Sequence, residues 1–208
     1  MATYIRATTA VEAWKRIIPK IMKTGLTRVG ERNLKTRWLD NVLIHLLKPF
    51  TGRVSPDYPF SQKVLQEKYA TQLLNPDRLD FEYTYGERLN AWGNEEINQL
   101  DYIVNKIQAN PNSRRAVATT WDPRKDDNAD EVPCLNHFVF MIRDDRLDLS
   151  VTIRSNDMYG AWPANVYALS ELLKHIAERV SMDTGKLTTL SVNAHIYEHD
   201  WKSAETLS

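Results

Sequence analysis

The stretch HFVFMIRDDRLDLSVTIR, residues 137–154, decides the fold class of this chain. In its second arm the positions 147, 149, 151 and 153 are apolar and the positions between them are polar, so an extended chain would have one apolar and one polar face. The polar run Asp144-Asp145-Arg146 separates the two arms and suits a tight turn. The pattern predicts an antiparallel hairpin with strands at 137–142 and 147–154.

Helical periodicity is found on both sides of this hairpin. Amphipathic helices are predicted at 9–23, 61–74, 95–109 and 165–181. Strands are predicted at 38–47, 116–121 and 187–197, a loop or short hairpin at 26–37, and a loop at 50–60. Helices and strands follow one another without a regular βαβ order, which favours an α+β fold in a single domain, 1–208.

The predicted last strand, 187–197, has two chemically different faces. Its apolar side chains are Leu190, Val192, Ala194 and Ile196. Its polar side chains are Thr189, Ser191, Asn193, His195 and Tyr197. Because residues two apart on a strand project from the same face, His195 and Tyr197 are predicted to lie side by side.

The composition excludes some classes of function. Lys and Arg total 27, and Asp and Glu also total 27, so the formal net charge is zero. A balanced chain argues against a generic nucleic-acid or membrane-surface binder, and no apolar run reaches the roughly 18 residues that span a bilayer. Residues 1–6 lack the apolar core of a signal peptide. With a single cysteine, which suits a reducing compartment, these features predict a cytoplasmic protein.

That single cysteine, Cys134, is the most informative candidate site residue. It stands in Glu131-Val132-Pro133-Cys134-Leu135 and cannot form an internal disulfide. Taken alone, it is either a small buried hydrophobic residue or a reactive thiol. Its sequence neighbours favour the thiol.

Five pieces of sequence, in order, resemble one known family. They are Tyr83-Thr84-Tyr85-Gly86-Glu87-Arg88-Leu89 continuing to Trp92, Ser113-Arg114-Arg115, Pro133-Cys134, Arg154-Ser155-Asn156-Asp157, and Asn165 followed by His195-Ile196-Tyr197. Together they resemble the thymidylate synthase family, most clearly over 83–201. Thr120-Trp121-Asp122-Pro123 is similar to the short archaeal-type and phage-type members. The resemblance implies a mixed sheet packed by helices, with one sheet face forming the interface of a homodimer.

The resemblance also implies the chemistry. In this family a cysteine thiolate adds to carbon 6 of a pyrimidine nucleotide, which activates carbon 5 toward a one-carbon unit. Cys134 would be that nucleophile, and nearby guanidinium groups are expected to lower the pKa of its thiol. The implied phosphate-binding residues are Arg154 and Ser155, Arg114 and Arg115 from the partner subunit, and Arg32, for which Arg28 and Arg37 are alternatives.

The resemblance assigns the remaining site residues as well. Asn165 would read the edge of uracil, although an asparagine there also suits a helix N-cap, and both roles are compatible. His195 and Tyr197 would hold the ribose 3′-hydroxyl. Asp157, which is also counted among the substrate-binding residues, would bind the pterin ring of 5,10-methylenetetrahydrofolate or of an archaeal methanopterin analogue. Trp92 and Leu89 would lie near that cofactor. Glu67 is the candidate general acid, with Glu87 as the alternative, and no metal is expected.

Leu135 stands where bacterial members carry histidine, and because short archaeal-type members also show leucine, this mainly assigns a branch. Two departures bear on the product: Leu89 replaces a tryptophan that shields the intermediate, and the chain ends shortly after Trp201. A site that admits water would give a hydroxymethyl product instead of a methyl group. We therefore predict a dUMP methyltransferase and keep a 5-hydroxymethylase of dUMP, dCMP or CMP as the alternative. A non-catalytic nucleotide-binding or RNA-binding protein is the third reading, against which Cys134 argues.

Overall fold

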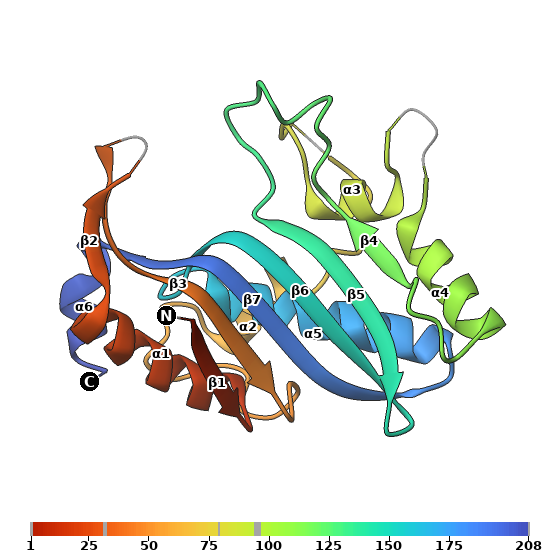
Figure 1. Cartoon of the computed structure of the whole chain (residues 1–208), viewed down its shortest axis with the longest axis horizontal. Coiled ribbons are helices and arrows are strands. Elements are labelled where there is room, and N and C mark those ends of the chain that lie inside the picture. The colour runs from red at the N-terminus through yellow and green to blue at the C-terminus, as the bar shows by residue number, and fades with distance from the viewer. Residues whose placement is uncertain (1, 31–32, 79, 94–96, 208) are drawn as a thin grey trace.

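The computed structural model describes residues 1–208 except 1, 31–32, 79, 94–96 and 208. Within the described ranges the strands form one seven-stranded sheet with the order β1-β3-β7-β6-β5-β4, and β2 pairs with β3 (Figure 1). The strands are β1 (Thr3–Ala7), β2 (Leu26–Val29), β3 (Lys35–Leu46), β4 (Val117–Thr119), β5 (Leu135–Arg143), β6 (Arg146–Asp157) and β7 (Asp183–Tyr197). The β1–β3 and β6–β7 pairs are parallel and the other pairs antiparallel, so the prediction of a mixed sheet in an α+β fold is confirmed.

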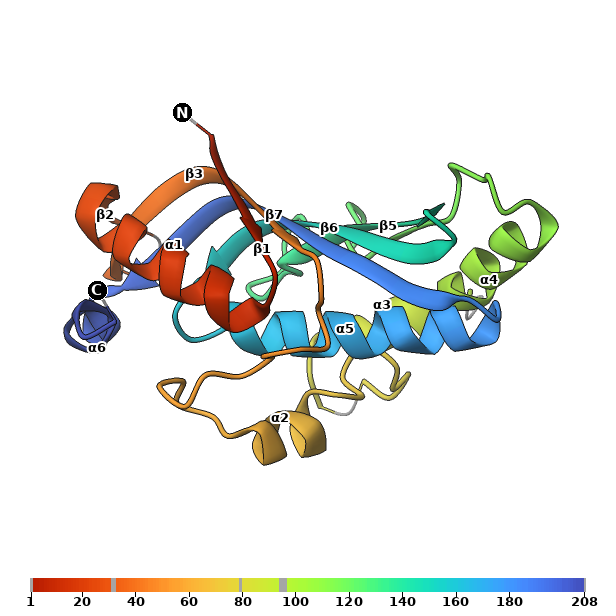
Figure 2. The same ribbon diagram turned by 90° about the horizontal axis from the view of Figure 1, so that it is seen from below.

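Helices cover one face of this sheet. The long helices α1 (Ala10–Thr24) and α5 (Trp162–Arg179) lie on the same side, and α2 (Gln62–Lys68) lies beyond α5 (Figure 2). The shorter helices are α3 (Tyr85–Asn90), α4 (Gln99–Ala109), the 3-10 helix η2 (Glu198–Asp200) and α6 (Trp201–Glu205). Apolar side chains of α5 such as Leu172 and Ile176 pack without solvent exposure against the buried face of the sheet, where Phe138 and Phe140 also lie. Burial of this apolar surface is the main stabilising term.

The predicted hairpin is confirmed. Strands β5 and β6 pair antiparallel in register from Leu135 with Ile153 to Arg143 with Arg146. Asp144 and Asp145 form the turn with φ values of 51° and 56°, the left-handed region that aspartate tolerates better than most residues. The segment 26–37 likewise contains a hairpin, made by β2 and the start of β3.

Helix boundaries differ from the predictions at three places. Helix α5 begins at Trp162 with a proline in its first turn, so Asn165 lies inside that turn and does not cap the helix. Helix α2 already ends at Lys68, with turns following it. Helix α4 begins at Gln99, capped by the side chain of Asn98.

In the middle of β7, at residues 189–192, the buried face is polar and the exposed face apolar, whereas Ala194 and Ile196 are buried as their apolar character predicts. The hydroxyls of Thr189 and Ser191 lie on the buried face, and both residues are almost fully shielded, whereas Val192 is 42% exposed. Buried hydroxyls are tolerated here because Trp162 Nε1 donates to Thr189 Oγ1 at 3.1 Å and Asn156 Nδ2 donates to Ser191 Oγ at 3.0 Å. The apolar residues Leu190 and Val192 consequently lie on the sheet face opposite the helices.

Candidate active site

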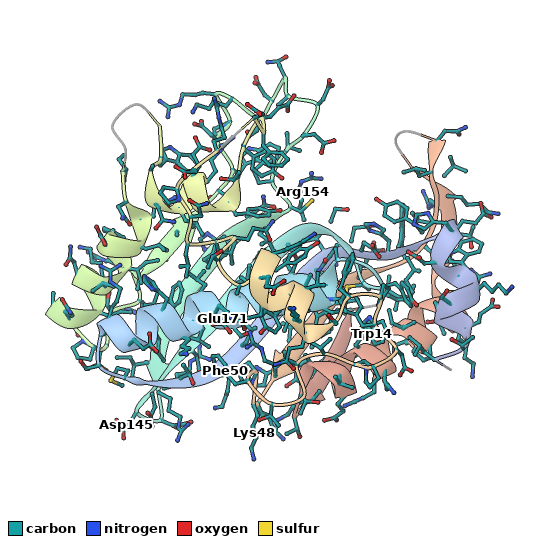
Figure 3. All side chains as sticks on the ribbon, turned by 180° about the vertical axis from the view of Figure 1, so that it is seen from behind. Trp14, Lys48, Phe50, Asp145, Arg154 and Glu171 are labelled. Atoms are coloured by element: carbon teal, nitrogen blue, oxygen red, sulfur yellow. The ribbon has the colours of Figure 1, made fainter. Side chains whose placement is uncertain are left out.

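A cavity of about 640 Å³ opens where β5, β6 and β7 meet the β2–β3 hairpin and the segment 129–132. Five predicted site residues line it together: Cys134, Arg154, Ser155, His195 and Tyr197. Parallel pairing of β6 with β7 brings them together, because Ser155 is the register partner of Asn193 and Asp157 that of His195. Arg154 lies at the cavity end of β6, and the hairpin turn with Asp145 lies at the other end (Figure 3).

Cys134 lies immediately before β5 and is held there by its backbone. Its carbonyl accepts a hydrogen bond from the amide of Arg154 at 2.9 Å, and its own amide donates to the hydroxyl of Tyr85 at 3.1 Å. The residue is partly buried against the hydrophobic core. Both contacts fix the main chain while the side chain lines the cavity.

The electrostatics of the thiol result from two opposing effects. Burial raises the pKa of Cys134 above its ordinary value, and the positive charge of Arg154 partly counteracts this. The guanidinium of Arg154 is engaged with the chain before the cysteine, through Nε to the carbonyl of Pro133 at 2.8 Å and Nη2 to that of Val132 at 2.9 Å. The guanidinium of Arg154 therefore lowers the pKa of the Cys134 thiol as expected. Burial of the thiol raises this pKa by more, so the net change is upward.

His195 and Tyr197 lie side by side as the strand alternation predicts. Their rings meet edge to face with centroids 4.8 Å apart. Nδ1 of His195 lies 2.9 Å from Oδ1 of Asn193, and an amide oxygen only accepts, so Nδ1 carries the proton. Burial lowers the pKa of His195 to about 4, so the ring is neutral at pH 7. Nε2 is then a buried acceptor, and it has no hydrogen-bond partner among the described residues.

Asp157 and Asn165 lie next to these strands and are tied into the fold. Oδ1 of Asp157 accepts from the amides of Tyr159 at 3.0 Å and Gly160 at 3.1 Å, and burial raises the pKa of this carboxyl. A Cβ at Gly160 would meet Oδ2 of Asp157 at 2.5 Å, so glycine leaves the second oxygen clear. Nδ2 of Asn165 donates to Oδ1 of Asn156 at 3.4 Å.

Comparison with known proteins agrees with this geometry. Residues 12–207 match the sequence model of the family described as thymidylate synthase. The chain belongs to the thymidylate synthase family. Proteins named "Putative thymidylate synthase" are similar along nearly the whole chain: the one from Methanosarcina acetivorans is 41% identical over 98% of this chain and 93% of its own length. The one from Methanothermobacter thermautotrophicus is 37% identical over 99% and 98%, and the one from Methanopyrus kandleri 34% identical over 94% and 93%.

The general reaction of the thymidylate synthase family is one-carbon transfer to a pyrimidine nucleotide, which makes this chain a member of an enzyme family. In the described part of the chain, no helix is long and apolar enough to cross a bilayer. Among the same residues, no three His, Cys, Asp or Glu side chains gather as a metal site.

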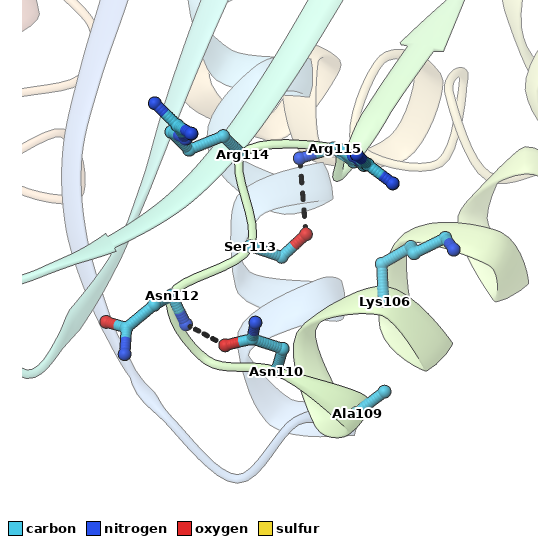
Figure 4. A pocket seen from close by; sticks show the side chains of 7 residues that line it. All are labelled: Lys106, Ala109, Asn110, Asn112, Ser113, Arg114 and Arg115. Carbon is cyan, nitrogen blue, oxygen red and sulfur yellow. Dashed lines mark hydrogen bonds between the residues drawn. The ribbon is translucent and has the colours of Figure 1, made fainter.

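Two further predicted residues of this family member lie apart from the cavity. Arg114 and Arg115 border a separate hollow of about 370 Å³ at the end of α4, and their side chains point to opposite sides of the chain (Figure 4). Ser113 Oγ accepts from the amide of Arg115 at 3.2 Å and shapes this turn. Neither arginine lines the cavity of its own chain.

The candidate acids and cofactor residues are also placed elsewhere. Glu67 lies on the outer side of α2, 60% exposed and 3.8 Å from Lys63. Leu89 is fully buried, and Trp92 lies beside the guanidinium of Arg88 at 5.3 Å from its ring centroid. Glu87 is largely buried, and its Oε2 has no hydrogen-bond partner among the described residues.

The structure does not identify which N-terminal arginine would bind the phosphate. Arg32 lies outside the described residues. The alternatives are already engaged: Arg37 donates to the carbonyl of Met22 at 2.9 Å and stacks over Trp201, and Arg28 stacks over Trp38. Gly30 and Leu34, which flank residue 32, do line the cavity.

Three residues at the site were not singled out from the sequence: Tyr85, Asn156 and Asn193. Asn193 could have been found, because it lies two residues before His195 on the same face of one strand. Tyr85 reaches Cys134 from a helix 49 residues away in sequence, and Asn156 contacts Asn165 from a neighbouring element, so neither contact has a local sequence signal.

Proposed function

We propose that this protein is a thymidylate synthase that transfers a one-carbon unit to carbon 5 of dUMP through a covalent adduct of Cys134. The observation that carries the proposal is the convergence of Cys134, Arg154, Ser155, His195 and Tyr197 on one cavity from three strands. Arg154 and Ser155 suit a phosphate, and His195 and Tyr197 suit a ribose hydroxyl. Together with the thiol of Cys134, they provide the groups needed to bind a nucleoside monophosphate and attack its base.

The reaction uses the thiolate first as nucleophile and later as leaving group. Addition forms the bond between sulfur and carbon 6, and the electrons of the ring double bond move toward the carbonyl at position 4. Carbon 5 thereby becomes the nucleophile toward the one-carbon unit. Loss of the carbon 5 proton would accompany breaking of the bond between that unit and its carrier. The sulfur–carbon bond breaks last, when the ring double bond re-forms and the thiolate of Cys134 leaves. The raised pKa of Cys134 means that its thiol must lose a proton before attack, which the neighbouring Arg154 assists.

Substrate recognition uses the remaining cavity residues. Arg154 and Ser155 present hydrogen-bond donors to the phosphate, for which the planar fork of arginine is suited. Nε2 of His195 is a buried acceptor without a partner among the described residues, so a ribose hydroxyl can donate to it. Asn165 can accept from N3–H of uracil and donate to its carbonyl at position 4.

The residues present fit the pterin ring of a methylene-folate or of a methanopterin analogue at one point. Asp157 uses Oδ1 for the backbone, and Gly160 leaves Oδ2 clear as an acceptor for pterin N–H groups. When bound, this cofactor supplies the one-carbon unit and, for the methyl product, the hydride. Trp92 remains a candidate contact, and Leu89 acts through packing because its side chain is buried.

We further propose a homodimer joined through the sheet face opposite the helices. Tyr4 is 61% exposed there and Val192 42% exposed, which suits burial against a second copy. Arg114 and Arg115 would then serve the partner's phosphate site. Val192→Asp should give a monomer in analytical ultracentrifugation and abolish activity; an active wild-type monomer would contradict this arrangement.

A 5-hydroxymethylase is the second candidate, favoured by one observation. Leu89 is fully buried and does not line the cavity, so it cannot shield an intermediate there as a tryptophan would. A cytoplasmic location is proposed for either enzyme, on the unpaired cysteine.

Product analysis tests the proposal. Purified protein is incubated with dUMP and methylenetetrahydrofolate, the nucleotide product is identified by mass spectrometry, and dihydrofolate is followed by absorbance. We expect dTMP with equimolar dihydrofolate, and no turnover by Cys134→Ala. Hydroxymethyl-dUMP without dihydrofolate would establish the second candidate, and turnover by Cys134→Ala would disprove the covalent mechanism.

A further inference from the structure

An indole N–H group in the wall of the cavity has no acceptor. Trp38 lies on β3 and lines the cavity together with His195 and Tyr197. Its Nε1 atom is buried and has no hydrogen-bond partner among the described residues. An indole nitrogen can only donate, and buried donors in folded proteins are nearly always paired. Trp38 therefore presents a donor that the described part of the chain leaves unpaired.

Three other tryptophans of the chain show the usual arrangement, in which a buried indole N–H reaches an acceptor. The three pairs are Trp14 Nε1 with the carbonyl of Met158 at 2.9 Å, Trp162 Nε1 with Oγ1 of Thr189 at 3.1 Å, and Trp201 Nε1 with the carbonyl of Ile196 at 3.1 Å. Trp38 differs from these three in lining the cavity of about 640 Å³. Its missing acceptor is therefore best sought in a ligand of that cavity.

A buried acceptor lies beside this donor. Strands β3 and β7 are neighbours in the sheet (Figure 1), and Trp38 is the register partner of His195 in this antiparallel pair. Partners of this kind project from the same sheet face with Cβ atoms about 4.5–5.5 Å apart. Nε2 of His195 is an acceptor, because Nδ1 carries the proton toward Asn193, and it too has no partner among the described residues. An unpaired donor and an unpaired acceptor thus line the cavity side by side.

Both rings are held in place without a ligand. The guanidinium of Arg28 lies over the ring of Trp38, 5.5 Å from its centroid. Nδ1 of His195 lies 2.9 Å from Oδ1 of Asn193, and the ring of Tyr197 packs edge to face on the other side of His195. A pair that is already oriented loses little conformational freedom when a ligand binds.

A hydroxyl group is the ligand group that matches this pair. It has one O–H donor and two acceptor lone pairs, so it can donate to His195 Nε2 and accept from Trp38 Nε1 at the same time. Its second lone pair remains for the hydroxyl of Tyr197. A phosphate dianion would accept from Trp38 but has no proton to give His195. A 2′-deoxyribose 5′-monophosphate has one free hydroxyl, the 3′-hydroxyl.

We propose that Trp38 is a substrate-binding residue whose indole N–H donates to the 3′-oxygen of the nucleotide, while the same hydroxyl donates to Nε2 of His195. The inference rests on the proposed function, because it takes dUMP as the substrate. A nucleotide without the 3′-hydroxyl would leave both buried groups unpaired in the complex. Trp38 thereby makes the site select nucleotides with a free 3′-hydroxyl.

The test compares two ligands, dUMP and 2′,3′-dideoxyuridine 5′-monophosphate, by isothermal titration calorimetry. Wild-type protein should bind dUMP more tightly. Trp38→Phe keeps an aromatic ring and removes the N–H, so the ratio of the two affinities should fall about fivefold, the size that one neutral hydrogen bond contributes. The loss should be in the affinity for dUMP, with that for the dideoxynucleotide nearly unchanged.

Trp14→Phe is the matched control. It also removes a buried indole N–H, but one that donates to a carbonyl of the protein and does not line the cavity. We expect a lower melting temperature with an unchanged ratio of affinities. Circular dichroism melts verify the folding of both variants.

A second measurement needs no variant. In wild-type protein labelled with ¹⁵N, the indole N–H signal of Trp38 is assigned through its contacts with the ring of His195. Addition of dUMP should move this signal downfield, as a new hydrogen bond does, and the dideoxynucleotide should not. This measurement carries the test if Trp38→Phe does not fold.

The outcomes separate the two proposals. Wild-type protein that does not bind dUMP would overturn the proposed function, and the inference with it. Wild-type protein that binds both nucleotides equally, or a ratio that is the same in Trp38→Phe, would overturn the inference alone. Equal weakening of both ligands in Trp38→Phe would assign Trp38 to packing or to another part of the nucleotide. A fall in the ratio shared by Trp14→Phe would assign it to general loosening, and either result would overturn the inference.

Discussion

The hydroxyl oxygen of Tyr85 lies 3.1 Å from the backbone nitrogen of Cys134 and 3.4 Å from that of Leu135, and accepts a hydrogen bond from each. Helix α3 thus holds the first residues of β5 through one side chain. Burial raises the pKa of Tyr85, so its hydroxyl stays protonated and keeps a donor for a further partner. The nucleophile's main chain is therefore positioned from outside its own strand.

Tyr85→Phe tests this contact. The change leaves two amides without their acceptor, and we expect a loss of about 1–3 kcal/mol in the free energy of unfolding. Turnover should fall further than stability explains, because Cys134 loses its fixed position. Urea unfolding and steady-state kinetics measure both, and Tyr102→Phe, at an exposed tyrosine of α4, is the control; equal effects of the two variants would contradict a specific role of Tyr85.

The pH dependence of Cys134 gives a second prediction. Because burial raises the pKa of the thiol, the thiolate fraction at pH 7 is small and grows about tenfold per pH unit. The rate of alkylation by iodoacetamide should therefore rise through pH 8 to 9 without a plateau. Arg154→Met removes the charge that lowers this pKa, so alkylation should become slower at every pH in that range, whereas the exposed Arg124→Met should not change it. A plateau near pH 7 in the wild type would show that the thiol is activated without substrate.

The fold could be predicted where side-chain alternation and burial agree. In β6, Leu147, Leu149, Val151 and Ile153 are all buried, as their spacing predicts. In β7 the same reasoning would bury Val192 and expose Ser191, and the structure has the reverse. The reason is that the helix-covered face there consists of hydroxyls with specific donors, whereas Leu190 and Val192 face the side that we propose to be covered by a second copy. Ala194 and Ile196, further along the strand, are buried as the alternation predicts.

The sequence predicts correctly those site residues whose side chains lie on or next to strands. Cys134, Arg154 and His195 meet because β5, β6 and β7 are neighbours in the sheet. The predicted residues on helices were less accessible to such reasoning: Leu89 is buried by tertiary packing, and Glu67 lies on the outer side of α2. Knowing that a residue belongs to a helix does not tell whether its side chain faces the cavity.

His195 predicts an acid sensitivity of the fold. The folded protein keeps this ring neutral down to about pH 4, while the unfolded chain takes up a proton near the ordinary value of 6.5. Between these two pKa values the unfolded state binds protons more tightly than the folded state. The free energy of unfolding is therefore unaffected by this residue above pH 6.5 and decreases as the pH falls toward 4. The difference amounts to about 3 kcal/mol. Melting temperatures of wild type and His195→Gln across pH 4–7 measure it: the variant should lose less stability in acid, and parallel curves would contradict the prediction.

The buried ion pair between Arg88 and Asp126 should matter far more than the neighbouring pair of Arg124 with Asp122, whose arginine is exposed. Arg88 donates to the two oxygens of Asp126 at 2.6 and 3.2 Å, and both residues are 4% exposed. This pair ties α3 to the segment that runs toward Cys134. Arg124, which contacts Asp122 at 3.3 Å, has a side chain that is 82% exposed.

Removing one partner tests this difference. Arg88→Met leaves the carboxylate of Asp126 buried and unpaired, and breaking such a pair costs about 3–5 kcal/mol. Arg124→Met removes an exposed charge that water already screens, so we expect a change within about 0.5 kcal/mol. Urea unfolding of both variants gives the two free energies. Equal destabilisation would mean that Asp126 is relieved by water or by a proton in the variant, and that the pair does not hold the segment leading to Cys134.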